Sequence, residues 1–485
     1  MGPAERTKTP FIFTDGSGKA EPAMRKLIRK YVMLGKNRGK TRNLNTNKMK
    51  NPYYSEKSNG YHDGPSSLLI KMRYSMIPNK VGSELSFTQF AAAVEPPLLH
   101  DLLKFSFMAK RIMYPLERYI VFHRKTNVDT SWFELLTFDA AYLHAAVFAS
   151  QAYISLISTG ENPAAARQAI VHHSAALRLL RERLSISNRE SKVSDSTVLV
   201  VLYLALHAHF MIDYNTAKHH MEGLRNIVDM RGGLFSFSYN TKLIIELLKC
   251  DLGIALNNGT KPTFFNDRPS EPLMPYILPT LAAEEPDHAT TRRYWKPVQL
   301  GISIDLVQAW TFLKRFCSTI NSAAEHKRQL PKETLLKAMA ALMYRLIWMN
   351  SFDPTSLDEA VRLSLLAFSS NIFLDWQNVK PSHAYLRHTY QNCLLNLSLP
   401  SALSPQFLLW MLMIGSLSTF NPADAAWLMP WMRVTIELCE AHTWSQLHRQ
   451  LKAFPWIDVL HDKPARAMFD AALSSQTSAG RASPG

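Results

Sequence analysis

Three capped helices that follow one another with short joins constrain the fold of this chain most. The first begins at 162–163, where an asparagine that can act as a cap precedes a proline suited to a first helical turn. Ser194 or Asp195 can cap the second, which is an apolar run. The third is expected over about 215–231 and closes at Gly232, because glycine adopts the left-handed C-terminal conformation at little cost. Short joins between consecutive helices predict antiparallel packing.

Helical signals continue through most of the remaining chain. One apolar face of the first helix is marked by large side chains at helical spacing: Ile170, Leu177, Leu180 and Leu184. Ser356 and Glu359 have the spacing of a capping box. Further helices are expected over 305–320, 331–349, 356–376, 383–397, 406–417, 422–441 and 445–453. Since no series of alternating strands competes, the sequence predicts an all-α fold, a large helical bundle of antiparallel helix pairs.

Composition divides the chain into an arm, a helical domain and a tail. The formal charge is +16, and Lys and Arg less Asp and Glu give 17 − 5 = +12 over 1–80, which leaves only +4 for the rest. We therefore expect a basic, largely disordered arm over 1–80 and a helical domain over 81–475. Seven prolines between 261 and 297 predict a long surface connection within that domain. Small and polar residues make 476–485 a predicted disordered tail.

The basic arm concentrates its charge between 24 and 50, where ten Lys or Arg occur without one Asp or Glu. Met24, Leu27, Ile28 and Tyr31 lie on one face of a short amphipathic helix at its start. The charge suits an import receptor or weak nonspecific contact with DNA phosphates. The residues expected to make these contacts are Arg25, Lys26, Arg29, Lys30, Lys36, Arg38, Lys40, Arg42, Lys48 and Lys50.

A nucleotide-binding loop does not fit the same stretch. The segment GKNRGKT has three residues between Gly35 and Gly39, whereas a phosphate-binding loop needs four, and a helix rather than a strand is expected before it. Catalytic signals are also missing, because no GxSxG elbow occurs and the paired Glu284 and Glu285 lie in the proline-rich connection. The sequence therefore predicts no enzyme, no catalytic residues and no cofactor.

Cysteine and histidine patterns do not predict a metal site. Cys250, Cys317, Cys393 and Cys439 lie at least 46 residues apart and have no zinc-binding spacing. Histidines crowd the three capped helices, at His172, His173, His207, His209, His219 and His220. Adjacent histidines on a helix point about 100° apart, so such pairs cannot chelate as an i, i+4 pair would. Polar packing between helices is the expected role.

Membrane association is not expected either. The N-terminal MGPAERTKTPFIF has no apolar core of signal-peptide length, and the longest apolar run, 198–206, is too short to span a bilayer. These features predict a soluble intracellular protein.

One segment resembles a known family. From Ala175 to Leu234 the chain reads AALRLLRERLSISNRESKVSDSTVLVVLYLALHAHFMIDYNTAKHHMEGLRNIVDMRGGL, which is similar to the core of the fungal-specific transcription factor domain. The residues that carry this motif, and for which the resemblance implies a structural role, are Asp195, His220, Gly223, Leu224, Gly232 and Gly233. FLLWMLMIGSLS and LKAFPWIDVLHDKPARAMFDAAL resemble closing segments of the same domain and contribute Trp410 and Trp456. The N-terminal FIFTDGSG followed by RKLIRKYVMLGKNRGK resembles the opening of family members that lack the zinc cluster, so the resemblance extends over most of the chain.

The resemblance implies a nuclear regulator of transcription that acts through helical protein contacts. Its expected partners are other transcription regulators or a second copy of the chain. Members of this family often carry a binuclear zinc cluster built from six closely spaced cysteines, but no cysteine precedes Cys250 here. The usual DNA-reading module is therefore missing. The alternative is a helical scaffold or adaptor without a role in transcription.

Aromatic and methionine side chains are frequent toward the C-terminus, and they leave two interpretations open. They are Trp410, Met411, Met413, Trp427, Met429, Trp431, Met432, Trp444 and Trp456. Such residues form the core of a helix bundle in one interpretation. In the other they line a groove for a small effector or a partner helix.

Overall fold

The computed structural model describes the helical body of the chain. The described residues are 88–113, 116, 119–121, 131–157, 162–186, 189–265, 294, 297–349, 351–374, 383–398 and 400–479. All of them belong to one compact unit, Asp63–Gly485. The predicted basic arm with its short helix, most of the proline-rich connection and the end of the predicted tail lie outside them.

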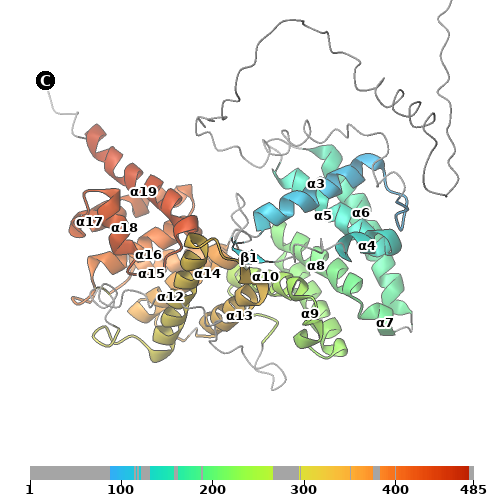
Figure 1. The fold of residues 1–485 in the computed structure, drawn as a ribbon, viewed down its shortest axis with the longest axis horizontal. Helices are drawn as coiled ribbons and strands as arrows, with labels where there is room; N and C mark the ends of the chain where they lie inside the picture. Colours follow the sequence, from blue (N-terminus) through green and yellow to red (C-terminus); the bar gives the residue numbers. More distant parts are fainter. Residues whose placement is uncertain are drawn as a thin grey trace, which may run out of the picture. The chain divides into compact units, whose positions relative to one another are not determined.

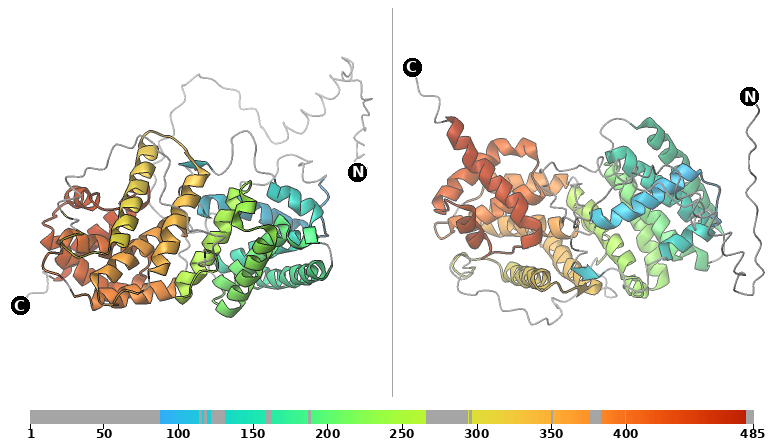
Figure 2. Two further views of the ribbon diagram at one scale, coloured as in Figure 1. Left: turned by 90° about the horizontal axis from the view of Figure 1, so that it is seen from below. Right: turned by 45° about the horizontal axis from the view of Figure 1, so that its top comes forward.

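The described residues are almost entirely helical, which confirms the predicted all-α fold class (Figures 1 and 2). The first group of helices comprises α3 (Pro96–Met113), α4 (Ser131–Phe138), α5 (Ala140–Ile157), α6 (Pro163–Ser185), α7 (Arg189–Lys192), α8 (Asp195–Phe210), α9 (Tyr214–Arg231), η2 (Leu234–Phe237) and α10 (Thr241–Asn258). The second comprises α12 (Ile304–Glu325), α13 (Lys332–Trp348), α14 (Leu357–Phe373), α15 (Ala384–Leu395), α16 (Pro405–Ser418), η3 (Pro422–Asp424), α17 (Ala425–Leu438), α18 (Trp444–Leu451) and α19 (Asp458–Ala479). Antiparallel pairing of these helices remains a prediction.

One hydrophobic core runs through both groups of helices. Helix α10 connects them, because it packs against α8 and α9 of the first group and against α13 and α15 of the second. Helices α10 and α13 lie side by side at the junction in Figure 1. A parallel bridge of two residues per strand, β1 (Ile120–Val121) with β2 (Leu330–Pro331), is the sheet structure in the described part of the chain.

The three capped helices form as predicted. The side chain of Asn162 accepts a hydrogen bond from the N–H of Ala165 at 3.1 Å, and Ser194 accepts from Thr197 at 3.3 Å. These caps satisfy amide groups that the first helical turn leaves without partners. At the end of α9, Gly232 has φ +105°, in the left-handed region that favours glycine.

The face of α6 that packs inward matches the apolar face marked in the sequence only in part, because Leu180 is buried and Leu177 packs partly buried against the core, whereas the other two marked side chains are exposed. Ile170 is 66% exposed and Leu184 is 39% exposed. The buried residues of α6 are Ala165, Ala169, His172, Ala176 and Leu180. Alanine side chains let the backbone of α6 approach α5, its main neighbour, whose own side chains fill the interface. The buried face of α6 is therefore set by its packing against α5, and not by where the largest apolar side chains lie along α6.

Two further expectations need correction. Ser356 caps α14 by accepting from the N–H of Glu359 at 3.2 Å, but the Glu359 carboxylate pairs with Arg362 at 2.5 Å. In a capping box that carboxylate would accept from the backbone N–H of the cap residue. Here it neutralises the buried guanidinium of Arg362 instead. Helix α19 continues to Ala479, beyond the predicted start of the tail at 476. Alanine and glutamine favour helix, and neither glycine nor proline occurs between 465 and 479.

Candidate functional site

The ten basic residues predicted to contact an import receptor or DNA lie outside the described residues. These are Arg25, Lys26, Arg29, Lys30, Lys36, Arg38, Lys40, Arg42, Lys48 and Lys50. Their role therefore remains a prediction. The sites described below all come from the helical body.

The motif residue Asp195 joins the two ends of the α8–α9 pair. Arg231, the last residue of α9, donates to the Asp195 carboxylate at 2.6 Å and to the carbonyl of Val193 at 2.9 Å. The hydroxyl of Tyr239 donates to the same carboxylate at 2.5 Å, and burial together with this bond raises the pKa of Tyr239 to about 12. The Arg231 guanidinium also lies 4.3 Å from the ring centre of Phe237. These contacts fix the chain as it turns out of α9.

The other motif residues in α9 differ in what they do. Leu224 has no exposed surface and belongs to the core. Gly232 and Gly233 both have positive φ, and the N–H of Gly233 donates to the carbonyl of Val228 at 2.9 Å, which closes the helix. Gly223 lies within the helix, and a Cβ there would meet nothing within 4 Å. Nothing in the packing therefore requires glycine at 223.

The C-terminal motif residues belong to an aromatic core. The indole N–H of Trp410 donates to the carbonyl of Pro455 at 3.0 Å, and its ring centre lies 4.9 Å from that of Trp310. Trp456 is 2% exposed, and its N–H donates to Asp462 at 2.7 Å. Met411, Met413 and Met432 are fully buried, and Trp427, Met429, Trp431 and Trp444 pack partly buried against the core. This packing matches the core interpretation of the aromatic and methionine residues.

Four histidines from three helices form a cluster that the sequence did not fully predict. His144 of α5 and His172 of α6 lie 2.8 Å apart between their Nδ1 atoms. The rings of His173 and His207 are 5.6 Å apart and both stand edge-on to Phe148 at 4.9 Å. Burial lowers the pKa of all four imidazoles.

His220 of α9 stands beside the cluster. Burial and then the charges of His173 and His219 lower its pKa, while Asp213 acts in the opposite direction. The cluster therefore favours neutral imidazoles at pH 7, which suits polar packing between helices. His144 was missed because it lies alone in an apolar stretch of the sequence.

A small cavity lies where α8, α10, the end of α14 and the start of α15 meet. Its volume is about 30 Å³, and its polar lining comes from His209, Glu246, Lys249, Cys250 and His383. Burial lowers the pKa of His209 to about 4 and that of His383 to about 3, so both are neutral at pH 7. A space of this size has room for about one water molecule and is far smaller than a ligand pocket. It is not the effector groove considered from the sequence.

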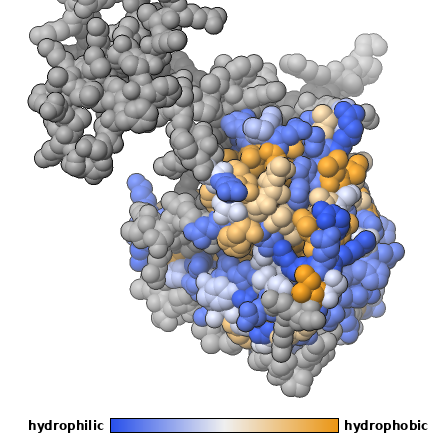
Figure 3. Space-filling model, turned by 90° about the vertical axis from the view of Figure 1, so that its right-hand side faces the viewer, coloured by the Kyte–Doolittle hydropathy of each residue, from blue (hydrophilic) through white to orange (hydrophobic). Residues whose placement is uncertain are grey.

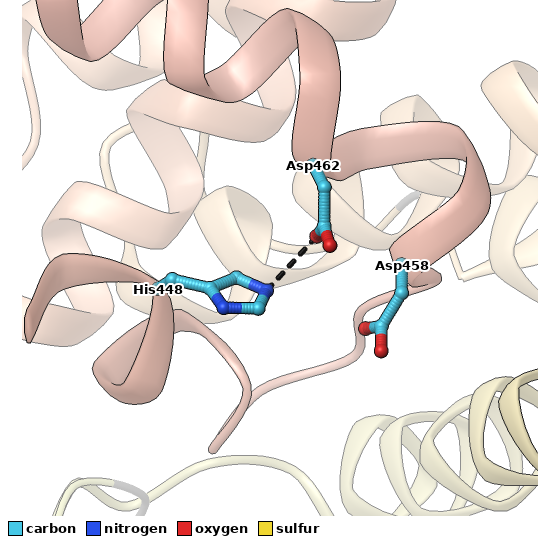
Figure 4. Close-up of side chains that lie close together, drawn as sticks. All are labelled: His448, Asp458 and Asp462. Carbon is cyan, nitrogen blue, oxygen red and sulfur yellow. Dashed lines mark hydrogen bonds and ion pairs between the residues drawn. The ribbon is translucent and has the colours of Figure 1, made fainter. Parts of the chain in front are cut away.

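His448, Asp458 and Asp462 form the group in the described part of the chain that brings three potential metal ligands together. Their ligand atoms all lie within 4.8 Å of one another. His448 comes from α18 and the two aspartates from α19, and Figure 4 shows the imidazole directed at Asp462 with Asp458 beside the same gap. The Nε2 atom of His448 lies 2.9 Å from Oδ1 of Asp462. Sequence spacing contains no metal-site signal here, since 14 residues separate His448 from Asp462.

Part of the molecular surface is apolar. Figure 3 shows apolar side chains gathered among hydrophilic ones on the face at the α4 and α6 end of the body. On the elements from α4 to the end of α6, the large apolar side chains that are at least half exposed are Phe138, Leu156, Ile170, Val171 and Ile186. Contiguous apolar patches on a surface commonly mark protein contacts.

One stretch of the described chain, Glu190–Phe210, is long and apolar enough by length and composition to cross a membrane. From the sequence, the apolar run 198–206 within this stretch was expected to be too short to span a bilayer. Over half of the most apolar 18 residues of this stretch are buried within the body, where α8 packs against α5, α9 and α10. That burial is the arrangement of a core helix.

Comparison with known proteins gives no assignment: no family model, curated protein or solved structure matches the chain.

Proposed function

We propose that this chain is a transcription regulator of the fungal-specific transcription factor domain type, without a zinc-cluster head of its own. The observation that carries the proposal is the segment of family resemblance. Its residues from Asp195 to Gly233 form the α8–α9 pair and its glycine exit, with Arg231 joining both ends. Asp195, Leu224 and Gly232 thus lie where this helical unit is joined at its ends, packed and closed, whereas Gly223 has no such role.

The helical body supports a regulator that works through protein contacts. Exposed apolar side chains such as Ile170 and Val171 lie on the outer face of α6 and are available to a helix of another regulator or of a second copy. The four cysteines are dispersed and buried in the core, so none belongs to a surface zinc module. DNA targeting then depends on a partner protein.

A tethered reporter assay tests this proposal. The full chain is fused to a heterologous DNA-binding domain, and transcription from a reporter with the matching site is measured. We expect a change of at least several-fold in either direction relative to the DNA-binding domain alone. Arg231→Ala should abolish the change because it opens the α8–α9 exit, whereas Arg178→Ala on the exposed side of α6 should preserve it. An unchanged reporter with a well-expressed fusion contradicts the proposal and favours the scaffold or adaptor function.

The basic arm is proposed to supply nuclear import together with weak nonspecific DNA affinity. Replacing Lys36, Arg38, Lys40 and Arg42 with alanine should abolish nuclear accumulation of a fluorescent fusion. The slope of log DNA affinity against log salt should fall by about 0.9 for each phosphate that the variant no longer neutralises. Unchanged nuclear signal together with unchanged DNA retention in low salt contradicts both roles and leaves an acidic protein partner.

A further inference from the structure

The group formed by His448, Asp458 and Asp462 has the geometry of a metal site that straddles two helices. Asp458 and Asp462 are four residues apart at the start of α19, which places both carboxylates on one face. His448 reaches the same point from α18 (Figure 4). One imidazole nitrogen and two carboxylates within 4.8 Å supply three ligands of types that first-row transition ions accept.

Neighbouring groups hold both carboxylates in place. The indole N–H of Trp456 donates to Oδ1 of Asp462 at 2.7 Å, and the ammonium of Lys452 lies 2.8 Å from Oδ2 of Asp458. The backbone N–H of Asp458 donates to the side chain of Asn321 on α12 at 3.0 Å. Outer contacts of this kind orient ligands in known metal sites and limit the reorganisation needed for binding.

The Oδ1 oxygen of Asp458 is a second, independent indication that a ligand binds here. Its Oδ1 atom has less than 1 Å² of exposed surface and no hydrogen-bond partner, although the side chain as a whole is 33% exposed. A carboxylate oxygen that is shielded from water and unpaired is costly. Because Lys452 already pairs with Oδ2, a cation bound beside His448 and Asp462 gives Oδ1 the partner it lacks.

We propose that His448, Asp458 and Asp462 bind one divalent first-row transition ion. The ligands are Nε2 of His448, Oδ1 of Asp458 and one carboxylate oxygen of Asp462, with solvent at the remaining positions. The imidazole favours ions such as Zn²⁺ or Co²⁺ over Mg²⁺ and Ca²⁺, which prefer oxygen ligands alone. The bound ion ties α18 to α19 and replaces the direct contact between His448 and Asp462. This site goes beyond the proposed function and does not depend on it.

The test uses the full chain, titrated with Co²⁺ and followed by visible absorption, with Zn²⁺ competition. We expect one Co²⁺ bound with His448 as a ligand, displacement by Zn²⁺, and no displacement by Mg²⁺ at the same concentration. At about one hundred times the dissociation constant, Zn²⁺ should raise the unfolding temperature by roughly 2–5 °C, since it binds only the folded chain.

Matched variants locate the site. His448→Ala and Asp462→Asn should each weaken binding at least about tenfold. Asp458→Asn should also weaken binding at least about tenfold. Because this variant keeps the shape of the side chain, the test stays decisive if His448→Ala fails to fold. His326→Ala, an exposed histidine at the end of α12, is the control and should leave binding unchanged.

Two results would overturn the proposal. One is undiminished Co²⁺ binding in folded Asp458→Asn and Asp462→Asn variants. The other is loss of binding in His144→Ala with retention in His448→Ala, which would place the metal on the histidine cluster instead.

Discussion

At the scale of single residues, buried charges in the body are held by specific partners. Glu359 and Arg362 on α14 pair through two contacts of 2.5 and 2.6 Å, with both side chains less than a tenth exposed. Arg362 also donates to the carbonyl of Leu346 at 3.0 Å, which connects α14 to α13. A buried pair of this kind contributes most through the penalty that follows when one partner is removed.

Glu359→Gln should therefore destabilise the body by about 3–5 kcal/mol, because the guanidinium stays buried without its counter-charge. The free energy of unfolding in urea measures this change. Arg178→Ala breaks a pair with Glu182 whose side chains are 64% and 55% exposed, and it should cost no more than about 0.5 kcal/mol. Equal effects from the two variants would show that Arg362 is not buried as described.

Buried neutral histidines should make the body sensitive to acid. His461 is 1% exposed; it accepts from the N–H of Ile457 at 3.0 Å and lies 3.2 Å from Asn371, and burial lowers its pKa to about 3. The unfolded chain has the ordinary pKa near 6.5 and binds the proton first. His461 thus contributes stability that is complete above pH 6.5 and is lost as the pH falls toward 3.

The measurement compares wild type with His461→Gln between pH 7.5 and 5.0. Wild type should lose about 2 kcal/mol more unfolding free energy than the variant over this interval. Asp251, whose pKa burial raises to about 6, acts in the opposite direction, but it is common to both proteins and cancels in the comparison. Identical pH profiles would contradict a buried neutral His461.

At the scale of elements, two helical glycines differ in what they are needed for. Packing requires Gly415, whereas Gly223 belongs to the family motif and meets no packing constraint. A Cβ at Gly415 in α16 would overlap the ring of Phe420, which stacks on Tyr390 at 5.3 Å. Gly415→Ala should therefore destabilise the body by about 1–3 kcal/mol. At Gly223 in α9 the same change meets open space and should stabilise by about 0.5–1 kcal/mol, because alanine favours helix.

Thermal unfolding of both variants checks these opposite signs. If Gly223→Ala is stable and yet abolishes the reporter response, Gly223 serves a contact with another molecule. Destabilisation by Gly223→Ala would instead contradict the packing around α9.

The sequence predicted helix ends better than helix faces. The caps at Asn162 and Ser194 and the exit at Gly232 depend on residues next to one another in the chain, so local chemistry sufficed. The buried face of α6 depends on α5, which no periodicity in α6 could specify. The candidate metal group was invisible for a related reason, since His448 and Asp462 meet only after α18 and α19 pack.

At the scale of the whole molecule, folding should not require metal. Burial raises the pKa of Cys317, Cys393 and Cys439 to about 12 and that of Cys250 well above its usual range, so these thiols stay protonated and poor ligands. Chain dialysed against a strong chelator should keep its far-ultraviolet circular dichroism and its cooperative thermal transition. The proposed ion should add only a few degrees to that transition. Loss of helix that zinc restores would contradict this expectation.

The central claim, that this chain regulates transcription from the nucleus, is tested most directly by removing it from the nucleus rapidly. A full-length fusion is recruited to a cytoplasmic anchor on addition of a small molecule, and nascent transcripts are sequenced within minutes. A defined set of genes should change at once, and a fusion carrying Arg231→Ala should leave the same genes altered even before recruitment. Nascent transcription that is unchanged by removal of the chain would contradict the account.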